Sequence, residues 1–230
     1  MNNYFRIYTI IISSIHCIKM SSNNIQLDDE ENTYVITRTG KKELLDTSQI
    51  VDRFKKLKNM EPVIYHINIF DLMLEVSRGL YSGISTYNID ELAANVAANL
   101  SISNPYFMQL ANRIAVSNHQ KNTSRGFIDK MKLAYLFKDN HGTIISKVSA
   151  EFYKYVEEHQ DTLEHMIDYK RDFLVDFFGM RTFQKQYGLK IGDKVIERPQ
   201  DLYMRTAIQI NMHTLDDIKM EHERIRDTYN

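Results

Sequence analysis

Residues that could bind a phosphorylated ligand are concentrated in two short segments of the first half of the chain. Residues 34–43 hold Arg38, two lysines and Glu43, and residues 79–86 form a turn rich in glycine, serine and threonine before Asp90. Cationic side chains, backbone amides and hydroxyls bind phosphate groups, and a carboxylate accepts hydrogen bonds from a base or a sugar. Together in one small domain, these groups suit a nucleotide better than they suit an arbitrary core.

Each of these residues also has a purely structural interpretation. The basic cluster is equally typical of a solvated hairpin face, on which Glu43 would pair with a lysine. Thr86 and Asp90 fit a turn and the first turn of a helix, and Lys121 fits a helix C-terminus, because the helix dipole favours those charges there. The spacing of a Walker loop and the Gly-x-Gly-x-x-Gly motif are both absent from the sequence. Spacing alone therefore leaves the nucleotide site as one of two interpretations.

Residue types that bind metals or act as nucleophiles form no recognisable motif. His159 and His165 are six positions apart and do not share a helix face, so the sequence predicts no metal site. The single cysteine, Cys17, excludes a disulfide framework and a cysteine-rich zinc site, and it indicates a reducing, cytoplasmic compartment. No catalytic residue is identified, since the geometry of a Ser–His–Asp triad does not follow from sequence order.

Length and composition limit the fold and the partners. A chain of 230 residues with 43% hydrophobic content can bury the core of one domain and part of another. Lys and Arg number 29 against 30 Asp and Glu, so the net charge of -1 predicts neither nucleic acid nor a membrane surface as a partner. The apolar run 7–12 is far shorter than the ~20 residues of a membrane span. Residues 1–32 are predicted to be a disordered or mis-assigned leader, with a signal peptide as the alternative.

The elements that must position the candidate groups are a hairpin and four helices, predicted as one domain over residues 33–122. Apolar residues on both sides of a Thr39-Gly40 turn predict the hairpin at 34–45. Only three residues are proline and eight are glycine, and this low content favours helices over turns. Apolar spacing and capping residues predict four helices. The first begins at one of the N-cap candidates 46–48, and the others begin near Ile69, at an Asn88–Glu91 capping box and at Asn104-Pro105.

Residues 123–230 are predicted to form a second, helical and incomplete domain. The expected elements are helices at 127–137, 149–158 and 162–169, an aromatic segment at 173–189 broken at Gly179 and Gly188, a tight turn at 190–195, a helix opened by Pro199, and an amphipathic helix from Leu215 to Tyr229. The predicted fold class is therefore mainly α, in an α+β arrangement.

The order of these segments closely resembles the N-terminal part of the large subunit of class I ribonucleotide reductase, over roughly residues 33–230 in one register. The first half matches through Val35-Ile36-x-Arg38-x-Gly40-x-x-Glu43, Gly79-Leu80-Tyr81-Ser82-Gly83-x-x-Thr86-x-x-x-Asp90-x-Leu92-Ala93-Ala94 and Ala111-x-Arg113-Ile114-Ala115-Val116-Ser117-Asn118. The second half matches through Tyr169-x-Arg171-Asp172-Phe173, Phe178-Gly179-x-x-Thr182 and Glu197-Arg198-Pro199-Gln200-x-x-x-Met204-Arg205. The resemblance implies an ATP-cone, which consists of a hairpin and a four-helix bundle. The helical entry to a catalytic barrel would follow it.

The resemblance implies an allosteric effector site for ATP or dATP, with Mg²⁺ and without a prosthetic group. The adenine-contacting carboxylate of the family matches Glu43, and its phosphate-contacting hydroxyl matches Thr86. The ribose-side residue that helps to separate ATP from dATP matches Asp90. Two phosphate-binding cations match Arg38 in the hairpin and Lys121 at the end of the fourth helix.

Two positions depart from the family pattern. Thr37 and Gln49 stand where the family usually has lysines. Each change removes a cation near the triphosphate, a charge-assisted contact of roughly 1.5–3 kcal/mol. Arg53, one turn beyond Gln49 on the same helix face, is a candidate to compensate. We therefore expect nucleotide binding that is weakened but detectable.

The family removes a ribose 2′-hydroxyl by means of a thiyl radical and a redox pair of cysteines, and Cys17 matches none of these. The chain is therefore predicted to be inactive alone and to be a truncated regulatory portion of a large subunit. The implied partners are the remainder of the large subunit, in cis or in trans, the small radical-generating subunit, and further copies through self-association of the cone. The alternatives are a free-standing nucleotide-sensing regulator and a helical assembly module with a vestigial cone.

Overall fold

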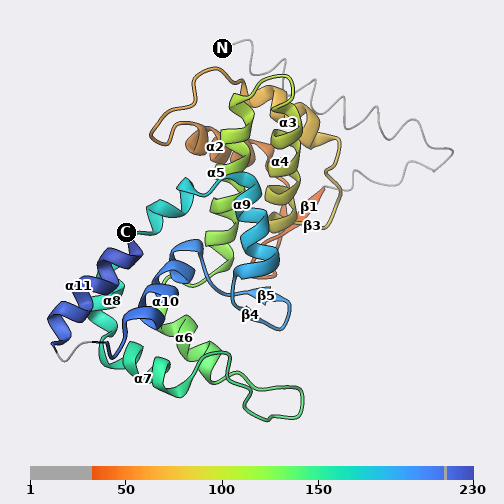
Figure 1. The fold of residues 1–230 in the computed structure, drawn as a ribbon. Helices are drawn as coiled ribbons and strands as arrows, with labels where there is room; N and C mark the ends of the chain where they lie inside the picture. Colours follow the sequence, from red (N-terminus) through yellow and green to blue (C-terminus); the bar gives the residue numbers. More distant parts are fainter. Residues whose placement is uncertain (1–32, 215–216) are drawn as a thin grey trace. The chain divides into compact units, whose positions relative to one another are not determined.

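The computed structural model describes residues 33–214 and 217–230. The predicted leader, residues 1–32 with Cys17, lies outside the described residues, as does Leu215 of the predicted last helix. The chain divides into two compact units, the first ending at Asn118 and the second beginning at His119 (Figure 1). The prediction of a mainly helical chain with a few short strands is confirmed.

The first unit combines a small sheet with packed helices. Its elements are β1 (Tyr34–Ile36), β2 (Lys42–Leu44), α2 (Thr47–Lys58), α3 (Ile69–Ser77), β3 (Ile84–Ser85), α4 (Thr86–Leu100) and most of α5 (Tyr106–Asn122). Its core is formed by apolar side chains of all four helices, among them Phe54, Leu72, Met73, Val76, Ala93, Ala97, Leu110 and Ile114. Burial of these apolar stripes is the main contribution to the stability of such a bundle.

The sheet has three strands, in the order β2-β1-β3. Val35 in the central strand lies opposite Glu43 of the antiparallel β2 and opposite Ile84 of the parallel β3. The hairpin turn contains Gly40 at φ +81°, a conformation that glycine adopts without steric cost. The hairpin was predicted, whereas β3 was not, because a strand of two residues is too short to show alternation. Since β3 continues directly into α4, the sheet brings the hairpin to the start of that helix.

Helix α4 begins earlier than its sequence predicts. Ser85 has an extended backbone, and its hydroxyl oxygen accepts a hydrogen bond from the N–H of Asn88 at 3.0 Å, so Ser85 is the N-cap. The predicted capping box of Asn88 and Glu91 is therefore wrong, because both residues lie inside the helix. As a result Thr86 and Asp90 are four positions apart within one helix and share a face.

Arg113 of α5 fixes that helix against the end of α2. Its guanidinium donates to the carbonyl oxygens of Leu57 at 2.8 Å, Lys58 at 3.1 Å and Met60 at 2.8 Å, and also to that of Pro62. The last carbonyl groups of a helix have no partner within the helix. The conspicuous arginine of the segment 111–118 is therefore structural and satisfies the end of α2.

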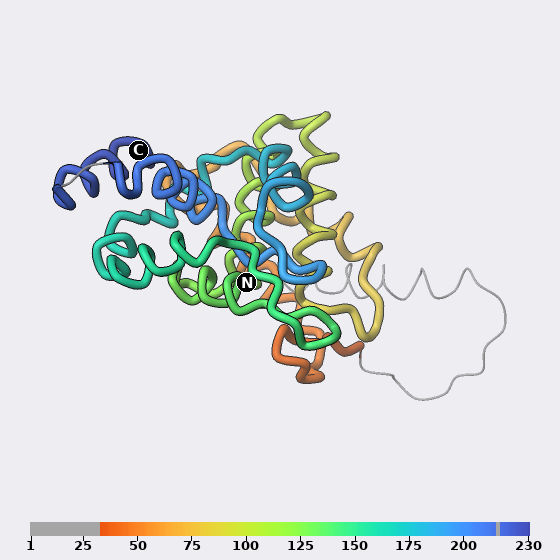
Figure 2. Tube along the Cα trace, turned by 60° about the horizontal axis from the view of Figure 1, so that its bottom comes forward, coloured from red at the N-terminus to blue at the C-terminus, as the bar shows by residue number. Residues whose placement is uncertain are grey.

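The second unit consists mainly of short helices. Its elements are α6 (Phe127–Tyr135), α7 (Ala150–Glu158), α8 (Gln160–Met166), the 3₁₀-helix η1 (Tyr169–Leu174), α9 (Phe177–Thr182), the π-helix η2 (Phe183–Tyr187), β4 (Lys190–Ile191), β5 (Lys194–Val195), α10 (Pro199–Asn211) and α11 (Ile218–Tyr229). Helices α10 and α11 lie side by side, as the Cα trace in Figure 2 also shows. The core includes Phe127, Met131, Phe152, Val156, Leu163, Met204, Ile208 and Ile225.

Two predictions for this unit need correction. The helix predicted at 162–169 is α8, which ends at Met166 because Asp168 caps the 3₁₀-helix that follows. Gly179 does not break the aromatic segment but lies inside α9, where its N–H donates to the N-cap carboxylate of Asp176 at 2.5 Å. A glycine within a short capped helix thus has no breaking effect here.

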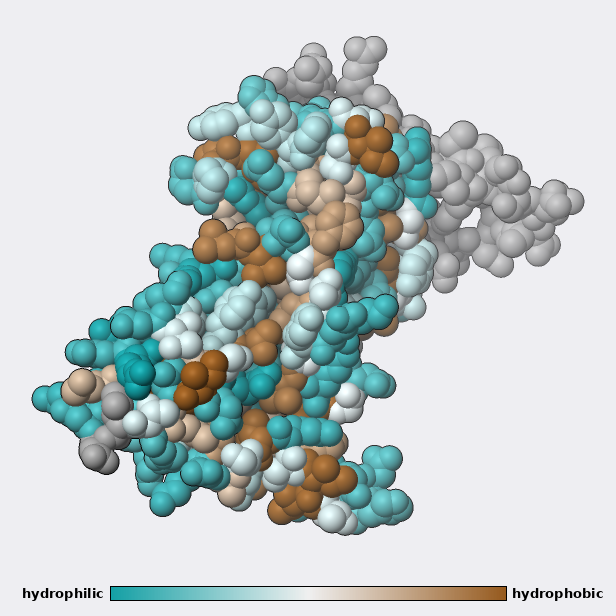
Figure 3. All heavy atoms as spheres, viewed as in Figure 1, coloured by the Kyte–Doolittle hydropathy of each residue, from teal (hydrophilic) through white to brown (hydrophobic). Residues whose placement is uncertain are grey.

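The described helices are short and mixed in polarity. In residues 33–214 and 217–230, none is long and apolar enough to cross a membrane. Figure 3 shows hydrophilic residues over most of the drawn face, with apolar residues in separate patches.

Candidate functional site

Three charged side chains of the first unit converge on one oxygen atom. Arg38 lies in the turn after β1, Arg53 lies in α2 and Asp90 lies in α4. Nη2 of Arg38 is 2.7 Å and Nη1 of Arg53 is 2.6 Å from Oδ2 of Asp90. The Asp90 side chain is only 3% exposed, whereas those of Arg38 and Arg53 are 22% and 20% exposed. Three separate elements thus bring two partly accessible cations to one buried carboxylate.

Thr86 belongs to the same group of side chains. Nη1 of Arg38 is 3.4 Å from the hydroxyl oxygen of Thr86, at the outer limit of a hydrogen bond. Because Thr86 and Asp90 are one helical turn apart, Arg38 reaches both from the hairpin. The structure therefore brings together Arg38, Thr86, Asp90 and the predicted compensating residue Arg53.

The electrostatics of the group favour an anion. Burial lowers the pKa of the Arg53 guanidinium from its ordinary value, and the positive charge of Arg38 acts in the same direction, while Asp90 opposes both. An arginine remains protonated even so. Two guanidinium charges against one carboxylate leave the three side chains with a positive charge. In addition, Nε–H of Arg53 is buried and has no hydrogen-bond partner among the described residues.

Two residues at the end of the segment 111–118 support the arginines, and sequence analysis did not identify them. Oδ1 of Asn118 accepts from Nη2 of Arg38 at 2.5 Å, and the hydroxyl oxygen of Ser117 accepts from Nη2 of Arg53 at 3.3 Å. Both lie in α5, which packs in the core of the first unit. The segment itself was conspicuous, but neutral polar side chains in a helix carry no signal of what they contact.

The two positions that depart from the family pattern make local contacts. The Thr37 hydroxyl accepts from the N–H of Lys41 at 3.0 Å and shares a hydrogen bond with Thr39 at 2.9 Å, so it stabilises the hairpin turn. Gln49 donates from Nε2 to the N-cap carboxylate of Asp46 at 3.1 Å, at the start of α2. These contacts are structural, and none of them reaches the two arginines.

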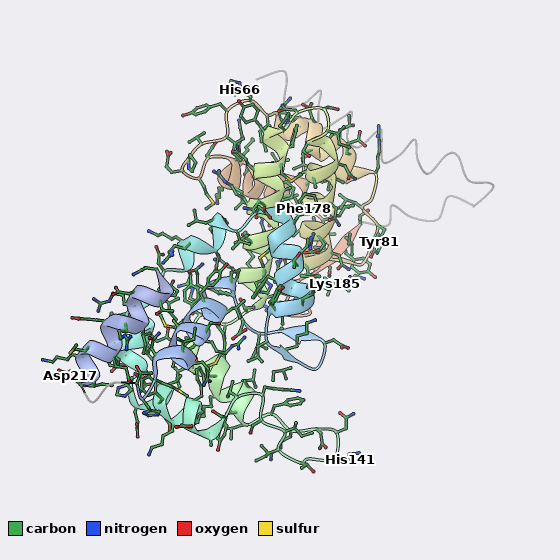
Figure 4. All side chains as sticks on the ribbon, viewed as in Figure 1. His66, Tyr81, His141, Phe178, Lys185 and Asp217 are labelled. Carbon is green, nitrogen blue, oxygen red and sulfur yellow. The ribbon has the colours of Figure 1, made fainter. Side chains whose placement is uncertain are left out.

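The remaining predicted residues lie on the surface. Glu43 is exposed on β2, next to Lys42, whose ammonium group lies 3.6 Å above the ring centroid of Tyr34. Lys121 is exposed in the last turn of α5, in the part of that helix assigned to the second unit. Figure 4 shows Tyr81 on the surface loop between α3 and β3. The structure thus groups Arg38, Thr86 and Asp90, and it leaves Glu43 and the second phosphate-side candidate, Lys121, solvent-accessible.

A pocket of the second unit has a different chemical character. Its volume is about 270 Å³, and it is lined by Val175, Gly179, Thr182, Phe183, Tyr187, Pro199, Leu202 and Tyr203. Its lining contains no charged side chain, so it lacks the cations that a polyphosphate requires. The charged group of the first unit is therefore the better candidate for a phosphorylated ligand.

Two histidines that are distant in sequence lie close together in the second unit. The rings of His159 and His222 are 4.8 Å apart between centroids and both lie beside Tyr155. Helices distant in sequence bring them together, which spacing could not reveal. In the part of the chain that the structure describes, no group of three or more His, Cys, Asp or Glu residues could hold a metal ion.

Two protein families match separate parts of the chain. The family described as "ATP cone domain" matches residues 33–122, which include the group of Arg38, Arg53 and Asp90. The family described as "Ribonucleotide reductase, all-alpha domain" matches residues 173–228 of the second unit.

Several similar proteins are large subunits of ribonucleoside-diphosphate reductase. The ribonucleoside-diphosphate reductase large subunit of Dictyostelium discoideum is 35% identical over 208 residues, 89% of this chain and 24% of that protein. The large subunit of Plasmodium falciparum (isolate Dd2) is 38% identical over 184 residues, 80% of this chain and 22% of that protein. The large subunit of Vaccinia virus (strain Copenhagen) is 35% identical over 190 residues, which are 80% of this chain and 24% of that protein. The chain spans about a quarter of the length of these relatives and is similar to their N-terminal part. The predicted resemblance is thereby confirmed.

Proposed function

We propose that this chain, which is similar to the N-terminal quarter of ribonucleoside-diphosphate reductase large subunits, is an allosteric regulatory region that binds ATP or dATP. The observation that carries the proposal is the pair of arginines on one oxygen of Asp90, within the residues that match the ATP cone. Two guanidinium groups beside one hydroxyl are a typical arrangement for binding phosphate oxygens.

The proposed roles follow from the positions of the side chains. Arg38 and Arg53 would bind phosphate oxygens, with the Thr86 hydroxyl as a further donor. Asp90, whose Oδ2 both arginines contact, would accept a hydrogen bond from a ribose hydroxyl. Glu43, exposed on β2, would accept a hydrogen bond from the adenine amino group.

Binding would exchange partners at the arginines. Asp90 is the anionic partner of Arg38 and Arg53, at 2.7 Å and 2.6 Å, and it offsets one of their two positive charges. A triphosphate carries several negative charges, so its oxygens compete effectively with a single carboxylate for the same N–H groups. Mg²⁺ on the triphosphate would offset part of the remaining charge. Thr37 and Gln49 cannot contribute positive charge, which supports weaker binding than a site with lysines at both positions.

The proposed consequence of binding is a change in assembly. ATP and dATP can shift an equilibrium between two assemblies only if each has different affinities for the two states. We propose that the chain acts with the remainder of a large subunit, in cis or in trans, with a small radical-generating subunit, and by self-association through the cone. Its role would then be to control deoxyribonucleotide synthesis in the cytoplasm, while the catalytic cysteines belong to the remainder of the large subunit.

Thermal unfolding with and without nucleotide tests the proposed site. A ligand that binds only the folded state at a hundred times its Kd stabilises it by about 2.7 kcal/mol, so MgATP should raise the Tm by several degrees. Arg53→Ala should lose most of this increase, because it removes a charge-assisted phosphate contact worth roughly 1.5–3 kcal/mol. The matched control is Arg78→Ala, which removes an exposed arginine that pairs with Glu75 in the same unit. An equal increase in Arg53→Ala and the wild type would refute the assignment of Arg53.

A further inference from the structure

We propose that Asn118 is a positioning residue, which holds the Arg38 guanidinium in its nucleotide-binding orientation before the nucleotide arrives. The inference rests on the proposed function of the cone and adds to it a residue that does not itself contact the ligand. Asn118 is the last residue of the first unit and its side chain is completely buried in α5.

The hydrogen bonds of Asn118 fix the orientation of its amide. Oδ1 accepts from Nη2 of Arg38 at 2.5 Å, and Nδ2 donates to Oε1 of Glu91 at 2.8 Å and to the carbonyl oxygen of Tyr87 at 3.4 Å. Rotating the amide by half a turn would place N–H groups against the arginine and an oxygen against the Glu91 carboxylate. A guanidinium only donates and a carboxylate only accepts, so the reversed amide would lose both bonds. Glu91 and Tyr87 of α4 thereby force Oδ1 to face Arg38.

A neutral acceptor is suited to this role. A long arginine side chain on a hairpin turn loses rotamer freedom when it binds a ligand, and a pre-set guanidinium has already lost it. Asp90 also orients Arg38, at 2.7 Å, but its negative charge competes with the phosphates. Asn118 can keep its hydrogen bond to Nη2 while phosphate oxygens replace Asp90, because an amide carries no net charge. Positioning by Asn118 therefore costs the site none of its positive charge.

The test combines nucleotide affinity with a double-mutant cycle. Asn118→Leu, of similar size but apolar, should weaken MgATP binding about tenfold in calorimetry, the effect of losing one charge-assisted contact. In an Arg38→Ala background the same change should have almost no further effect, since Asn118 acts through Arg38. Asn211→Leu is the control: it removes another buried asparagine with two hydrogen bonds, in the second unit, and should leave affinity unchanged. If Asn118→Leu does not fold, Asn118→Ser replaces it, because the shorter side chain also cannot reach Arg38.

A second measurement needs no nucleotide and separates this inference from the proposed function. Amide hydrogen exchange around the hairpin turn, residues 37–41, should be faster in Asn118→Leu than in the wild type and unchanged in Asn211→Leu. If the wild type binds no nucleotide, the proposed function fails, and the exchange rates alone decide the role of Asn118. Equal exchange in Asn118→Leu and the wild type would overturn the positioning role, and so would an equal loss of affinity with and without Arg38.

Discussion

At the scale of single residues, the candidate site is organised around the carboxylate of Asp90. Its Oδ2 atom is the common partner of two arginines from different elements, while its side chain is 3% exposed. Removing one partner from a buried ion pair normally destabilises a protein more than the pair itself stabilises it. Asp90 therefore has a structural role in addition to the proposed role beside the ribose.

Asp90→Asn tests the ribose-side role. A carboxylate only accepts hydrogen bonds, whereas a carboxamide also donates them, so we expect the ratio of ATP to dATP affinity to move to within about twofold of unity. The unfolding free energy should also fall, by about 1–3 kcal/mol, because two guanidinium groups lose their counter-charge. Calorimetric titrations of both nucleotides measure the ratio, and Glu75→Gln provides the control, since its carboxylate pairs with an arginine on the surface. A ratio that stays at the wild-type value would contradict the assignment.

Part of this candidate site can be predicted from the sequence, through a family resemblance and through helix periodicity. Arg38, Thr86 and Asp90 follow from a family resemblance in which charged and hydroxyl residues stand at fixed spacing. Arg53 follows from helix periodicity, because it is one turn from Gln49. Asn118 could not be predicted, since an amide in a helix has the same appearance whether it is solvated or bound to an arginine in the distant hairpin.

The buried carboxylate of Asp172 in the second unit should make the unfolding free energy depend on pH. Its carboxylate is fully buried and accepts from Gln120 at 2.7 Å and from the N–H of Gln200 at 3.1 Å. Burial raises its pKa to about 6, despite those two hydrogen bonds, and the charge of Asp201 adds to the increase. The folded state therefore binds a proton more readily than the unfolded state, whose carboxyl has its ordinary pKa of 3.8. The unfolding free energy contributed by this group falls as the pH rises from about 4 to about 6.

The corresponding variant is Asp172→Asn, which cannot titrate. Between pH 4 and pH 6, the wild type should lose about 2 kcal/mol of unfolding free energy relative to this variant. Urea unfolding at half-unit pH intervals measures the difference, and Asp161→Asn, at an exposed position of α8, should follow the wild type. Parallel curves for Asp172→Asn and the wild type would show that Asp172 does not bind its proton more tightly in the folded state.

At the scale of elements, a helix cap can be predicted where it depends on local sequence, but not where it follows a short strand that pairs with a distant one. Asp46, the N-cap of α2, was one of three predicted candidates, because a capping side chain acts on neighbouring N–H groups. The N-cap Ser85 was missed because it is also the last residue of β3, and pairing with β1 is not visible in local sequence. The Asn88–Glu91 pattern fitted a capping box locally, but tertiary pairing placed the helix start three residues earlier.

Arg113 provides a test at this scale, because it joins α5 to the end of α2. Arg113→Lys should lower the unfolding free energy by about 2 kcal/mol, since an ammonium group cannot reach four carbonyl oxygens in the fixed geometry of a guanidinium. Arg78→Lys should change it by less than about 0.5 kcal/mol, because its ion pair is exposed. Urea unfolding compares the two variants. An equal, small effect of both would mean that the carbonyl contacts of Arg113 contribute little to stability.

At the scale of the whole molecule, the two units carry different chemistry. The first unit holds a group of partly accessible cations around Asp90, whereas the second holds buried ion pairs such as Lys130–Asp201, with both side chains at most 1% exposed. A buried pair with no access to solvent cannot bind a nucleotide. The accessible cations that the proposed effector site requires therefore lie in the first unit.

The most direct test of the proposed effector site is calorimetric titration of the full chain with MgATP, with MgGTP as the control. We predict saturable heat with one site per chain for MgATP and weaker binding of MgGTP, because guanine has an oxygen where adenine has the amino group that Glu43 would bind. Glu43→Gln should reduce this preference. The absence of heat with MgATP at millimolar concentration would contradict the proposal that this chain binds an adenine nucleotide.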